Sequence, residues 1–596
     1  MKKNDLTFRV AGRAGDGSLT TGDVLSKIWK DMGLWLATYK DFPSNIRGLP
    51  TNMTIRLKDR QIYYGRKNKL DYLLAFDDTN VKIHLHDLVP GGVVIYDNSV
   101  KKELPPELIR DDVHYYYAPL KKIAKEDLGL EVIKNIVAVG VASYLLGMDQ
   151  ERTKEIIYKF FHARKGEKIA SSNVDAFLKG WNYAKEHLEK KDEYVVEEVP
   201  DRKKTYFIMG NEAVAFGAIV AGCRFISSYP ITPATDVLEI LARELPKYGG
   251  IMIQAEDELS AINYAAGAAY AGVRSMTTTS GPGLSLKTET LGLLVMNETP
   301  LVIYVAQRGG PSTGLPTKPE QSDLFHAVFG GHGDAPRIVI APGNVKEMYW
   351  LTIDAFNIAE KYQTPVIVLT DQILAQNKFS VPVEDITIEG VKIERGKLLT
   401  QEELNEIIKK EGQFLRYKIT EDGISPRSIP GQEGGLYTAN SNEHQEDGYT
   451  TEDPKIRVAM MDKRLRKIYK TARESGDLPE DLIHGYEDAE IGLIGFGYTY
   501  GPIMEAIENL AAEGIKVKFL QMRTLWPVDT EKLSKFIDSS EKVIVVDHNA
   551  QAQLSSLIKM VYENHDKLEV LKKYDGYGFT PEIIENKVKE VLSYVS

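Results

Sequence analysis

The sequence predicts a multidomain α/β protein, because strand-like and helix-like segments alternate along most of the chain. Its 596 residues are more than one hydrophobic core usually organises, so roughly three or four domains are expected. Hydrophobic residues make up 43% and charged residues 27% of the chain, which is typical of a soluble globular protein.

The first predicted domain covers residues 1–190. It begins with LTFRVAGRAGDG, which predicts a strand, a glycine loop and then a helix. Apolar segments at 72–76 and 91–97 predict further strands, and a helical pattern lies near 131–146. The stretch 186–204 is charged and weakly periodic, so we interpret it as a linker.

Three further ranges complete the predicted organisation. Residues 191–380 contain the apolar segments TYFIM, MTTT, PLVIYVAQ and TPVIVLTD, which predict strands separated by helices. Residues 381–486 are polar and rich in glycine, which predicts an irregular linking region with one basic helix at 461–474. Residues 487–596 again alternate strand and helix and form the last predicted domain.

The glycine loop GRAGDG (12–17) suggests two kinds of cofactor site and matches neither. It lacks the spacing G-x-G-x-x-G of a dinucleotide-binding loop. In a thiamine diphosphate signature, Gly-Asp-Gly is followed by paired asparagines, yet here Asn45 stands beside Ile46. We therefore expect a tight turn between a strand and a helix.

The net charge and the hydropathy of the chain argue against two classes of partner, nucleic acids and membranes. The net charge of −11 argues against nucleic acid, because phosphate binding requires clustered lysine and arginine. No apolar run reaches the roughly 18 residues that span a bilayer, and the N-terminus goes directly into a strand without a signal peptide. We expect a cytoplasmic protein that binds neither nucleic acid nor membranes.

Cys223 is the single cysteine of the chain. The chain can therefore form neither an internal disulfide nor a cysteine-ligated iron–sulfur cluster by itself. Its apolar neighbours predict a small buried hydrophobic side chain. The 11 histidines include no HExxH pattern, and no metal site is expected in this chain.

The segment SSYPITPATD (227–236) follows an apolar stretch and contains two prolines, which exclude both a continued strand and a helix interior. Thr232 and Pro233 predict a helix N-terminus, with the threonine as N-cap and the proline as the first helical residue. The expected buried stripe of that helix comprises Val237, Leu238, Leu241 and Leu245.

Two further segments carry charged residues that are candidates for catalysis or ligand binding. Glu256, Asp257 and Glu258 open a helix rich in alanine and glycine, which suits either electrostatic capping or a carboxylate held in a close interface. Arg308 follows a buried strand, where ligands of α/β sheets bind, and its planar guanidinium matches a carboxylate or phosphate. A surface arginine is the alternative.

Taken together, these motifs resemble the α subunit of 2-oxoacid:ferredoxin oxidoreductases. The resemblance rests on TTTSGPG, QRGGPSTGLPT, SNEHQEDG and the motif formed by Tyr229, Pro230, Ile231, Thr232 and Pro233. The first predicted domain, with its glycine loop, Asn45-Ile46-Arg47-Gly48 and GGVVIYD, is similar to the γ domain of that family. The resemblance implies a γ domain, then a thiamine-enzyme pyrimidine-type domain and a transketolase C-terminal-like domain.

The resemblance also implies a reaction. A 2-oxoacid would be decarboxylated oxidatively with coenzyme A and thiamine diphosphate, giving an acyl-CoA, carbon dioxide and reduced ferredoxin. Glu258 would act on the thiamine ring, with Glu256 as the fallback, and the substrate would contact Thr232, Arg308 and Thr317. A β subunit would bind most of the thiamine diphosphate with magnesium and hold a four-iron four-sulfur cluster, in a heterodimer or a dimer of heterodimers.

Alternatives stay open at this point. The order of domains favours pyruvate, 2-oxobutyrate or 2-oxoglutarate as substrates over aryl or branched-chain 2-oxoacids. A non-catalytic ligand-binding protein on the same fold is a second alternative. The presence of Thr232, Glu258 and Arg308 argues against that alternative.

Overall fold

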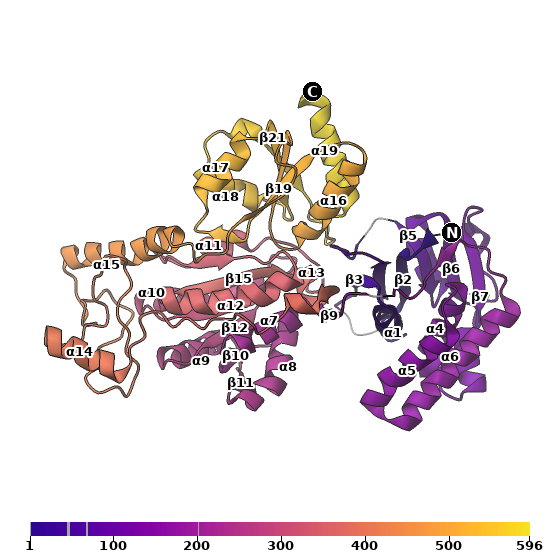
Figure 1. Cartoon of the computed structure of the whole chain (residues 1–596), viewed down its shortest axis with the longest axis horizontal. Coiled ribbons are helices and arrows are strands. Elements are labelled where there is room, and N and C mark those ends of the chain that lie inside the picture. Colours follow the sequence, from indigo (N-terminus) through magenta and orange to yellow (C-terminus); the bar gives the residue numbers. More distant parts are fainter. Residues whose placement is uncertain (1, 45–47, 67–68, 201, 596) are drawn as a thin grey trace. The chain divides into compact units, whose positions relative to one another are not determined.

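The computed structural model describes residues 2–44, 48–66, 69–200 and 202–595 (Figure 1). Asn45, Ile46 and Arg47, which contributed to the γ-domain resemblance, lie outside the described residues. The chain divides into two compact units, Met1–Ile208 with Asn377–Asp385, and Met209–Gln376 with Ile386–Ser596. The multidomain α/β class is confirmed, and the four predicted ranges stay predictions.

The first unit is built on a mixed sheet with the strand order β7-β6-β5-β2-β4-β3-β16-β9. Strands β2, β5, β6 and β7 run parallel, whereas β4 pairs antiparallel with both β2 and β3. In chain order the strands are β2 Asp5–Arg13, β3 Trp35–Asp41, β4 Pro50–Lys58, β5 Leu70–Ala75, β6 Leu88–Asp97, β7 His114–Ala118, β9 Thr205–Met209 and β16 Lys378–Pro382. A separate pair joins β1 (Lys2–Lys3) to β8 (Tyr194–Val195).

Helices of the first unit pack on this sheet through a core that includes Phe8, Trp29 and Tyr72, which are all fully buried. The helices are α1 Ser18–Asp31, α2 Asp78–His84, α3 Leu120–Lys122, α4 Lys134–Leu145, α5 Gln150–Lys165 and α6 Glu167–His187. The helical pattern expected near 131–146 corresponds to a short 3₁₀ turn followed by α4.

The glycine loop is the tight turn that the sequence predicted. It joins β2 to α1, and Gly17 at the helix N-cap has a φ of 83°, which favours glycine. The Asp16 carboxylate accepts a hydrogen bond from Lys134 at 2.9 Å and another from the Arg13 backbone N–H at 3.1 Å. This aspartate is therefore engaged within its own unit.

Strand β16 returns to the first unit from far along the chain. Phe379 pairs with Ala37 in an antiparallel bridge, and the Leu36 N–H donates to Ser380 Oγ at 2.9 Å. The backbone N–H of Lys40 also donates to Asn377 Oδ1 at 2.7 Å. These contacts explain why residues 377–385 belong to the first unit.

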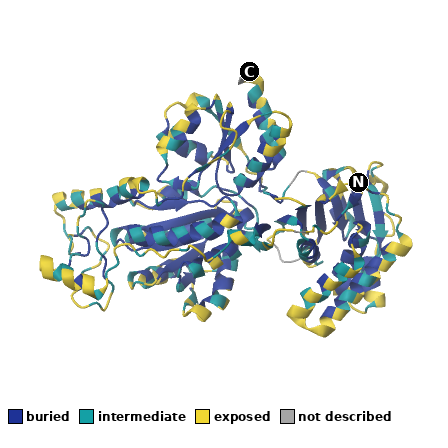
Figure 2. Cartoon of the chain, viewed as in Figure 1, coloured by how far each residue is buried: buried dark blue, intermediate teal, exposed yellow. Residues whose placement is uncertain are grey.

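The second unit contains a seven-stranded sheet with the order β11-β10-β12-β13-β15-β14-β20, in which only β20 runs antiparallel to its neighbour. Its strands are β10 Phe225–Ser228, β11 Ile251–Gln254, β12 Ser275–Thr279, β13 Leu301–Gln307, β14 Ile338–Ile340, β15 Pro365–Asp371 and β20 Thr524–Trp526. The central strands β12, β13 and β15 are buried along their whole length, as expected of a parallel sheet covered on both faces (Figure 2).

Helices cover this sheet: α7 Gly210–Val220, α8 Thr235–Glu244, α9 Glu258–Tyr270, α10 Gly281–Met296, α11 Leu324–Phe329, α12 Val345–Tyr362 and α13 Gln372–Gln376. A five-stranded sheet with the order β17-β19-β18-β21-β22 follows, formed by β17 Leu482–Gly485, β18 Ile491–Gly495, β19 Val517–Gln521, β21 Lys542–Asp547 and β22 Leu568–Lys572. Its helices are α16 Tyr500–Ala512, α17 Thr530–Asp538, α18 Gln553–Val561 and α19 Pro581–Val595. Both sheets contribute to one hydrophobic core cluster.

The polar region between the two sheets has few regular elements, α14 (Gln401–Glu411) and α15 (Pro454–Arg466). The basic helix expected at 461–474 begins earlier, because Asp453 caps it and Pro454 occupies its first turn. It continues as a π-helical turn over Lys467–Ala472. Within the described residues, no helix is long and apolar enough to cross a membrane.

Candidate functional site

Three loops of the second unit leave neighbouring parallel strands at the same edge of the sheet. The loop 229–234 follows β10, the turn Ser280–Gly283 follows β12, and the loop 308–318 follows β13. Because the carboxyl ends of parallel strands form the binding edge of an α/β sheet, this arrangement places Thr232 and Arg308 together at that edge.

The expectation that Thr232 caps a helix is wrong. Residues 232–234 form a turn in which the Ala234 N–H donates to the Ile231 carbonyl at 2.9 Å, and helix α8 begins only at Thr235. This turn moves the helix start three residues beyond Thr232. The predicted stripe of α8 is nevertheless buried and comprises Val237, Leu238, Leu241 and Leu245.

Asn211 of α7 holds the loop 229–234 in place through hydrogen bonds. Its side-chain amide donates to the Pro233 carbonyl and to Asp236 Oδ2, both at 2.8 Å. The Tyr304 hydroxyl on β13 donates to Asn211 Oδ1 at 2.6 Å. All three polar groups of the amide are therefore used to fix the loop, which leaves the Thr232 side chain half-buried beside it.

Arg308 lies against this loop and is only 8% exposed. Its Nη1 donates to the Thr232 carbonyl at 2.8 Å and its Nη2 to the Thr313 carbonyl at 3.3 Å. The remaining donor Nε is buried and has no hydrogen-bond partner among the described residues. Burial lowers the pKa of Arg308, and the Asp323 carboxylate opposes that shift. A buried donor without a partner indicates a place for a ligand acceptor.

Glu258 is the first residue of α9, and Asp257 caps the helix by accepting from the Ser260 N–H at 2.7 Å. Glu256 is exposed, whereas Glu258 is only 8% exposed. The described residues provide no hydrogen bond to the Glu258 carboxylate. This contrast favours Glu258 over Glu256 as the carboxylate that meets a ligand.

The first turn of α10 makes room for that carboxylate. A Cβ atom on Gly283 would lie 2.7 Å from Glu258 Cγ and 2.9 Å from its Oε1, which is closer than carbon and oxygen atoms can approach. One turn later, the buried Lys287 Nζ donates to the Glu258 carbonyl and to Thr277 Oγ1, both at 3.0 Å. Burial lowers the pKa of Lys287 to about 8, although Glu258 and Asp257 oppose the shift.

A cleft of about 820 Å³ opens beside Arg308. It is lined by the first turn of α10, the loop 308–313, residues of the segment 320–326 and residues 549–553 and Tyr574 from the following sheet domain. Thr317 is not among the residues that line it. That residue is half-buried in the turn where the Lys318 N–H donates to the Leu315 carbonyl at 3.1 Å.

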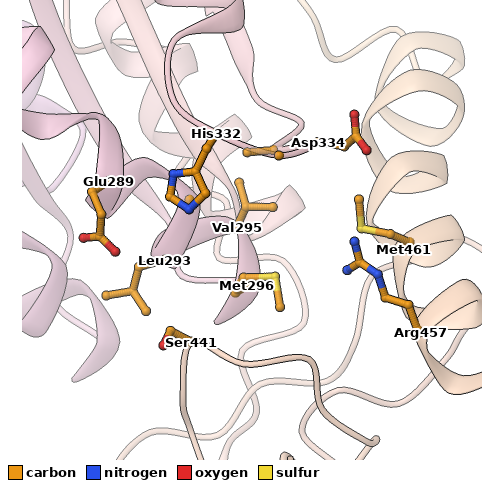
Figure 3. Close-up of a pocket in the computed structure, with 12 residues that line it drawn as sticks. Glu289, Leu293, Val295, Met296, His332, Asp334, Ser441, Arg457 and Met461 are labelled. Atoms are coloured by element: carbon orange, nitrogen blue, oxygen red, sulfur yellow. The ribbon is translucent and has the colours of Figure 1, made fainter. Parts of the chain in front are cut away.

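A second hollow of about 290 Å³ lies at the other end of α10 (Figure 3). Glu289, Leu293 and Met296 come from α10, and Arg457 and Met461 from α15, while His332 and Asp334 belong to the loop before β14. Its charged side chains are exposed, and Arg457 already pairs with Glu443 at 2.6 Å. This hollow does not assemble buried reactive groups as the cleft at Arg308 does.

Family models match three successive parts of the chain. Residues 7–183 match "Pyruvate ferredoxin/flavodoxin oxidoreductase", residues 216–463 match "Pyruvate flavodoxin/ferredoxin oxidoreductase, thiamine diP-bdg", and residues 489–584 match "Pyruvate:ferredoxin oxidoreductase core domain II". A 2-oxoacid:ferredoxin oxidoreductase α subunit of Aeropyrum pernix is 34% identical, with 93% of each chain covered. The chain belongs to the 2-oxoacid:ferredoxin oxidoreductase family.

Other relatives agree. The 2-oxoglutarate oxidoreductase subunit KorA of Mycobacterium tuberculosis is 33% identical, covering 99% of this chain and 92% of the relative. The solved 2-oxoglutarate:ferredoxin oxidoreductase of Magnetococcus marinus, with 2-oxoglutarate, coenzyme A and succinyl-CoA bound, has a TM-score of 0.91 at 38% identity. It covers 99% of this chain and 100% of its own. The recognised family and the predicted domain types are thereby confirmed.

In this oxidoreductase subunit the structure brings together Thr232 and Arg308 by a direct hydrogen bond. Two other groups of the site were missed by sequence reasoning, Lys287 beneath Glu258 and Asp323 in the cleft. The lysine lies three residues after Leu284 and four before Leu291, on the apolar face of the helix, and a lysine at that spacing is a signal that could have been used. Nothing in the sequence around Asp323 distinguished it from a surface residue.

Proposed function

We propose that this α-type subunit binds the 2-oxoacid at Arg308 and Thr232 and presents Glu258 to the thiamine ring. The observation that carries the proposal is the buried Nε of Arg308, which has no partner among the described residues and belongs to a side chain that lines the cleft. A 2-oxoacid carboxylate would supply the missing acceptor, and a charge-assisted bond of this kind is among the stronger hydrogen bonds in proteins. The Thr232 hydroxyl would add a contact to the substrate, and Thr317 is proposed as a further contact although it does not line the cleft.

The residues present fit thiamine diphosphate. Glu258 is a buried residue whose carboxylate has no hydrogen-bond partner among the described residues, and Gly283 leaves space beside it. When bound, thiamine diphosphate supplies the carbanion chemistry of decarboxylation. Glu258 would hold and move a proton at a ring nitrogen, and its close packing against Gly283 in the first turn of α10 would orient the carboxylate.

The full enzyme then needs a β subunit. With Cys223 as its one cysteine, this chain cannot ligate a four-iron four-sulfur cluster alone, so we assign the cluster, and the magnesium with most of the thiamine diphosphate contacts, to the partner. Ferredoxin would accept the electrons and coenzyme A the acyl group. A cytoplasmic location suits a protein whose cysteine is a buried free thiol.

The substrates proposed are pyruvate, 2-oxobutyrate and 2-oxoglutarate, and the names of two relatives favour 2-oxoglutarate. The test is a substrate panel with Arg308→Ala in the complete enzyme, measured as ferredoxin reduction. Every 2-oxoacid shares the C1 carboxylate, so kcat/KM should fall by a similar factor, about 10–100-fold, for all of them. A loss confined to one substrate would instead place Arg308 at the far end of the 2-oxoacid.

A further inference from the structure

A second buried group in the cleft, the Asp323 carboxylate, has an oxygen without a hydrogen-bond partner in the part of the chain that the structure describes. Asp323 precedes α11, and its backbone N–H donates to Gln307 Oε1 at 3.0 Å. Its carboxylate oxygen Oδ2 is buried and accepts no hydrogen bond from the described residues. A Cβ atom on Gly281 would lie 2.6 Å from that oxygen, so the carboxylate packs directly against the first turn of α10.

The charged and titratable groups around Asp323 come from every side of the cleft. Arg308 lies at the end of β13, Glu320 and His326 flank the aspartate in its own segment, and Tyr574 lines the cleft from the last sheet domain. Burial and the Glu320 charge raise the pKa of Asp323 to about 7, although Arg308 opposes the shift. Burial raises the pKa of Glu320 and lowers that of His326.

The hydrogen-bonding groups of the two reactants, the 2-oxoacid and coenzyme A, indicate which of them binds next to the Asp323 carboxylate. An ionised 2-oxoacid presents only acceptor oxygens, its carboxylate and its keto group, and these suit the donors of Arg308. A carboxylate needs a donor. Coenzyme A carries a thiol whose proton must be lost when the thioester forms, so its S–H group is the matching donor.

We propose that Asp323 is the proton acceptor for the thiol of the acyl-accepting substrate, a coenzyme A-type thiol bound in the cleft beside Arg308. The proposal rests on the proposed function of this site. The S–H bond breaks, its proton passes to the Asp323 carboxylate, and its electron pair stays on sulfur. The thiolate then bonds to the acyl carbon, the bond that had held the acyl group breaks, and its electron pair departs with the leaving group.

The test uses the complete enzyme with its partner subunit and compares wild type with Asp323→Asn. In the wild type, kcat/KM for coenzyme A should rise with pH and level off above about 7, once Asp323 is ionised. A thiol with a pKa of about 8.5 is only a few per cent thiolate at neutral pH. The variant should therefore lose about 30-fold at pH 7 and recover to within about threefold of wild type by about pH 9.

Two further measurements separate this role from a structural one. The 2-oxoacid KM should change less than about threefold in Asp323→Asn, a difference small beside the catalytic effect of a general base. Inhibition by a coenzyme A analogue with hydrogen in place of the thiol should be unchanged, because that analogue has no S–H proton to give. Asp323→Glu should restore much of the lost rate at pH 7.

Two carboxylate-to-amide variants test whether the charge next to Asp323 sets the pH dependence. Glu320→Gln removes the neighbouring negative charge that raises the pKa of Asp323, so the rise of kcat/KM should move to lower pH. Glu289→Gln removes an exposed carboxylate of α10 that lies in the other hollow, and it should leave the profile unchanged.

Loss in Asp323→Asn without recovery at high pH, or an equal loss for the 2-oxoacid, would overturn the proposal. If the assignment of the 2-oxoacid site to Arg308 is wrong, the two variants should give a different set of kinetic results. If Arg308→Ala leaves every 2-oxoacid unaffected while Asp323→Asn still recovers at high pH, the thiol site stands and the 2-oxoacid assignment falls.

Discussion

Lys287 Nζ donates a hydrogen bond to the backbone carbonyl of Glu258 at 3.0 Å, and both groups are buried. The same ammonium donates to Thr277 Oγ1 on β12 at 3.0 Å. One cation therefore ties the start of α9 to the sheet and to α10, close to the carboxylate that is proposed to meet the thiamine ring. We infer that Lys287 positions Glu258.

Replacing Lys287 with methionine should lower kcat by at least about 10-fold while the 2-oxoacid KM changes little, because the lysine orients a group that acts on the thiamine ring and does not bind the 2-oxoacid. Leaving the Glu258 carbonyl and the Thr277 hydroxyl unsatisfied should also cost about 1–3 kcal/mol of stability. Steady-state kinetics and urea unfolding of the complete enzyme check both effects. Lys247→Met, which removes an exposed lysine paired with Glu244, is the control.

The same lysine predicts a pH effect with a definite sign. The pKa of Lys287 is lowered to about 8 in the folded chain, against about 10.4 for an unfolded lysine. Between these values the unfolded chain binds a proton that the folded chain lacks, so the Lys287 contribution makes stability rise with pH. Unfolding midpoints measured at about pH 7.5 and about pH 9.5 should show this rise in wild type and less of it in Lys287→Met.

Glu258→Gln should reduce turnover by about 10²–10⁴-fold, because an amide keeps the shape of the side chain but cannot exchange a proton. Assembly with the partner subunit should persist, since none of the described residues donates a hydrogen bond to the carboxylate that would be lost. Ferredoxin reduction and gel filtration measure the two properties. Glu256→Gln, two residues earlier and exposed, should keep activity within about threefold of wild type. The assignment fails if these two variants exchange behaviour.

The sequence predicted best where structure depends on neighbouring residues. The turn from β2 into α1 at Gly17 and the buried stripe of α8 follow from local chemistry. Thr232 was misread as a cap because the loop is fixed by Asn211, on another helix. The return of β16 to the first sheet depends on pairing with β3, more than 300 residues away in the chain.

The candidate site likewise combines residues that the sequence predicted with contacts that only the folded chain forms. Arg308 and Thr232 were named from motifs, but the bond between Arg308 and the Thr232 backbone carbonyl needed the folded loops. Lys287 lies 29 residues after Glu258, and Asp323 lies in a segment that only folding brings against Gly281. Such contacts depend on how α9, α10 and the loop before α11 pack, which no local pattern encodes.

Thr232→Val should leave stability within about 0.5 kcal/mol of wild type, because Thr232 does not cap α8. If its hydroxyl contacts the 2-oxoacid, KM should rise several-fold, as expected for the loss of a hydrogen bond worth about 1 kcal/mol. Thermal unfolding and substrate kinetics test the two statements separately. A loss of stability near 1–2 kcal/mol, the range typical of a removed N-cap, would revive the capping interpretation.

A buried ion cluster holds the polar region 386–480 against the end of α10. Glu298 accepts hydrogen bonds from Lys463 at 2.6 Å and Lys467 at 2.7 Å, and all three side chains are buried. Arg416 donates to the Glu298 carbonyl at 2.8 Å. Burial alone would raise the pKa of Glu298, but Lys463, Lys467 and Arg416 hold it well below its usual range.

Glu298→Gln should destabilise the enzyme by about 3–5 kcal/mol at neutral pH, because two buried ammonium groups lose their counter-charge. Since the folded pKa of Glu298 is depressed, its contribution is present above the unfolded value of about 4.3 and is lost as pH falls below it. Wild-type unfolding midpoints should therefore drop between about pH 5 and 3, with a shallower drop in Glu298→Gln. Glu406→Gln, an exposed carboxylate in α14, is the control. Equal stability of Glu298→Gln and this control at neutral pH would show that the cluster does not hold the region in place.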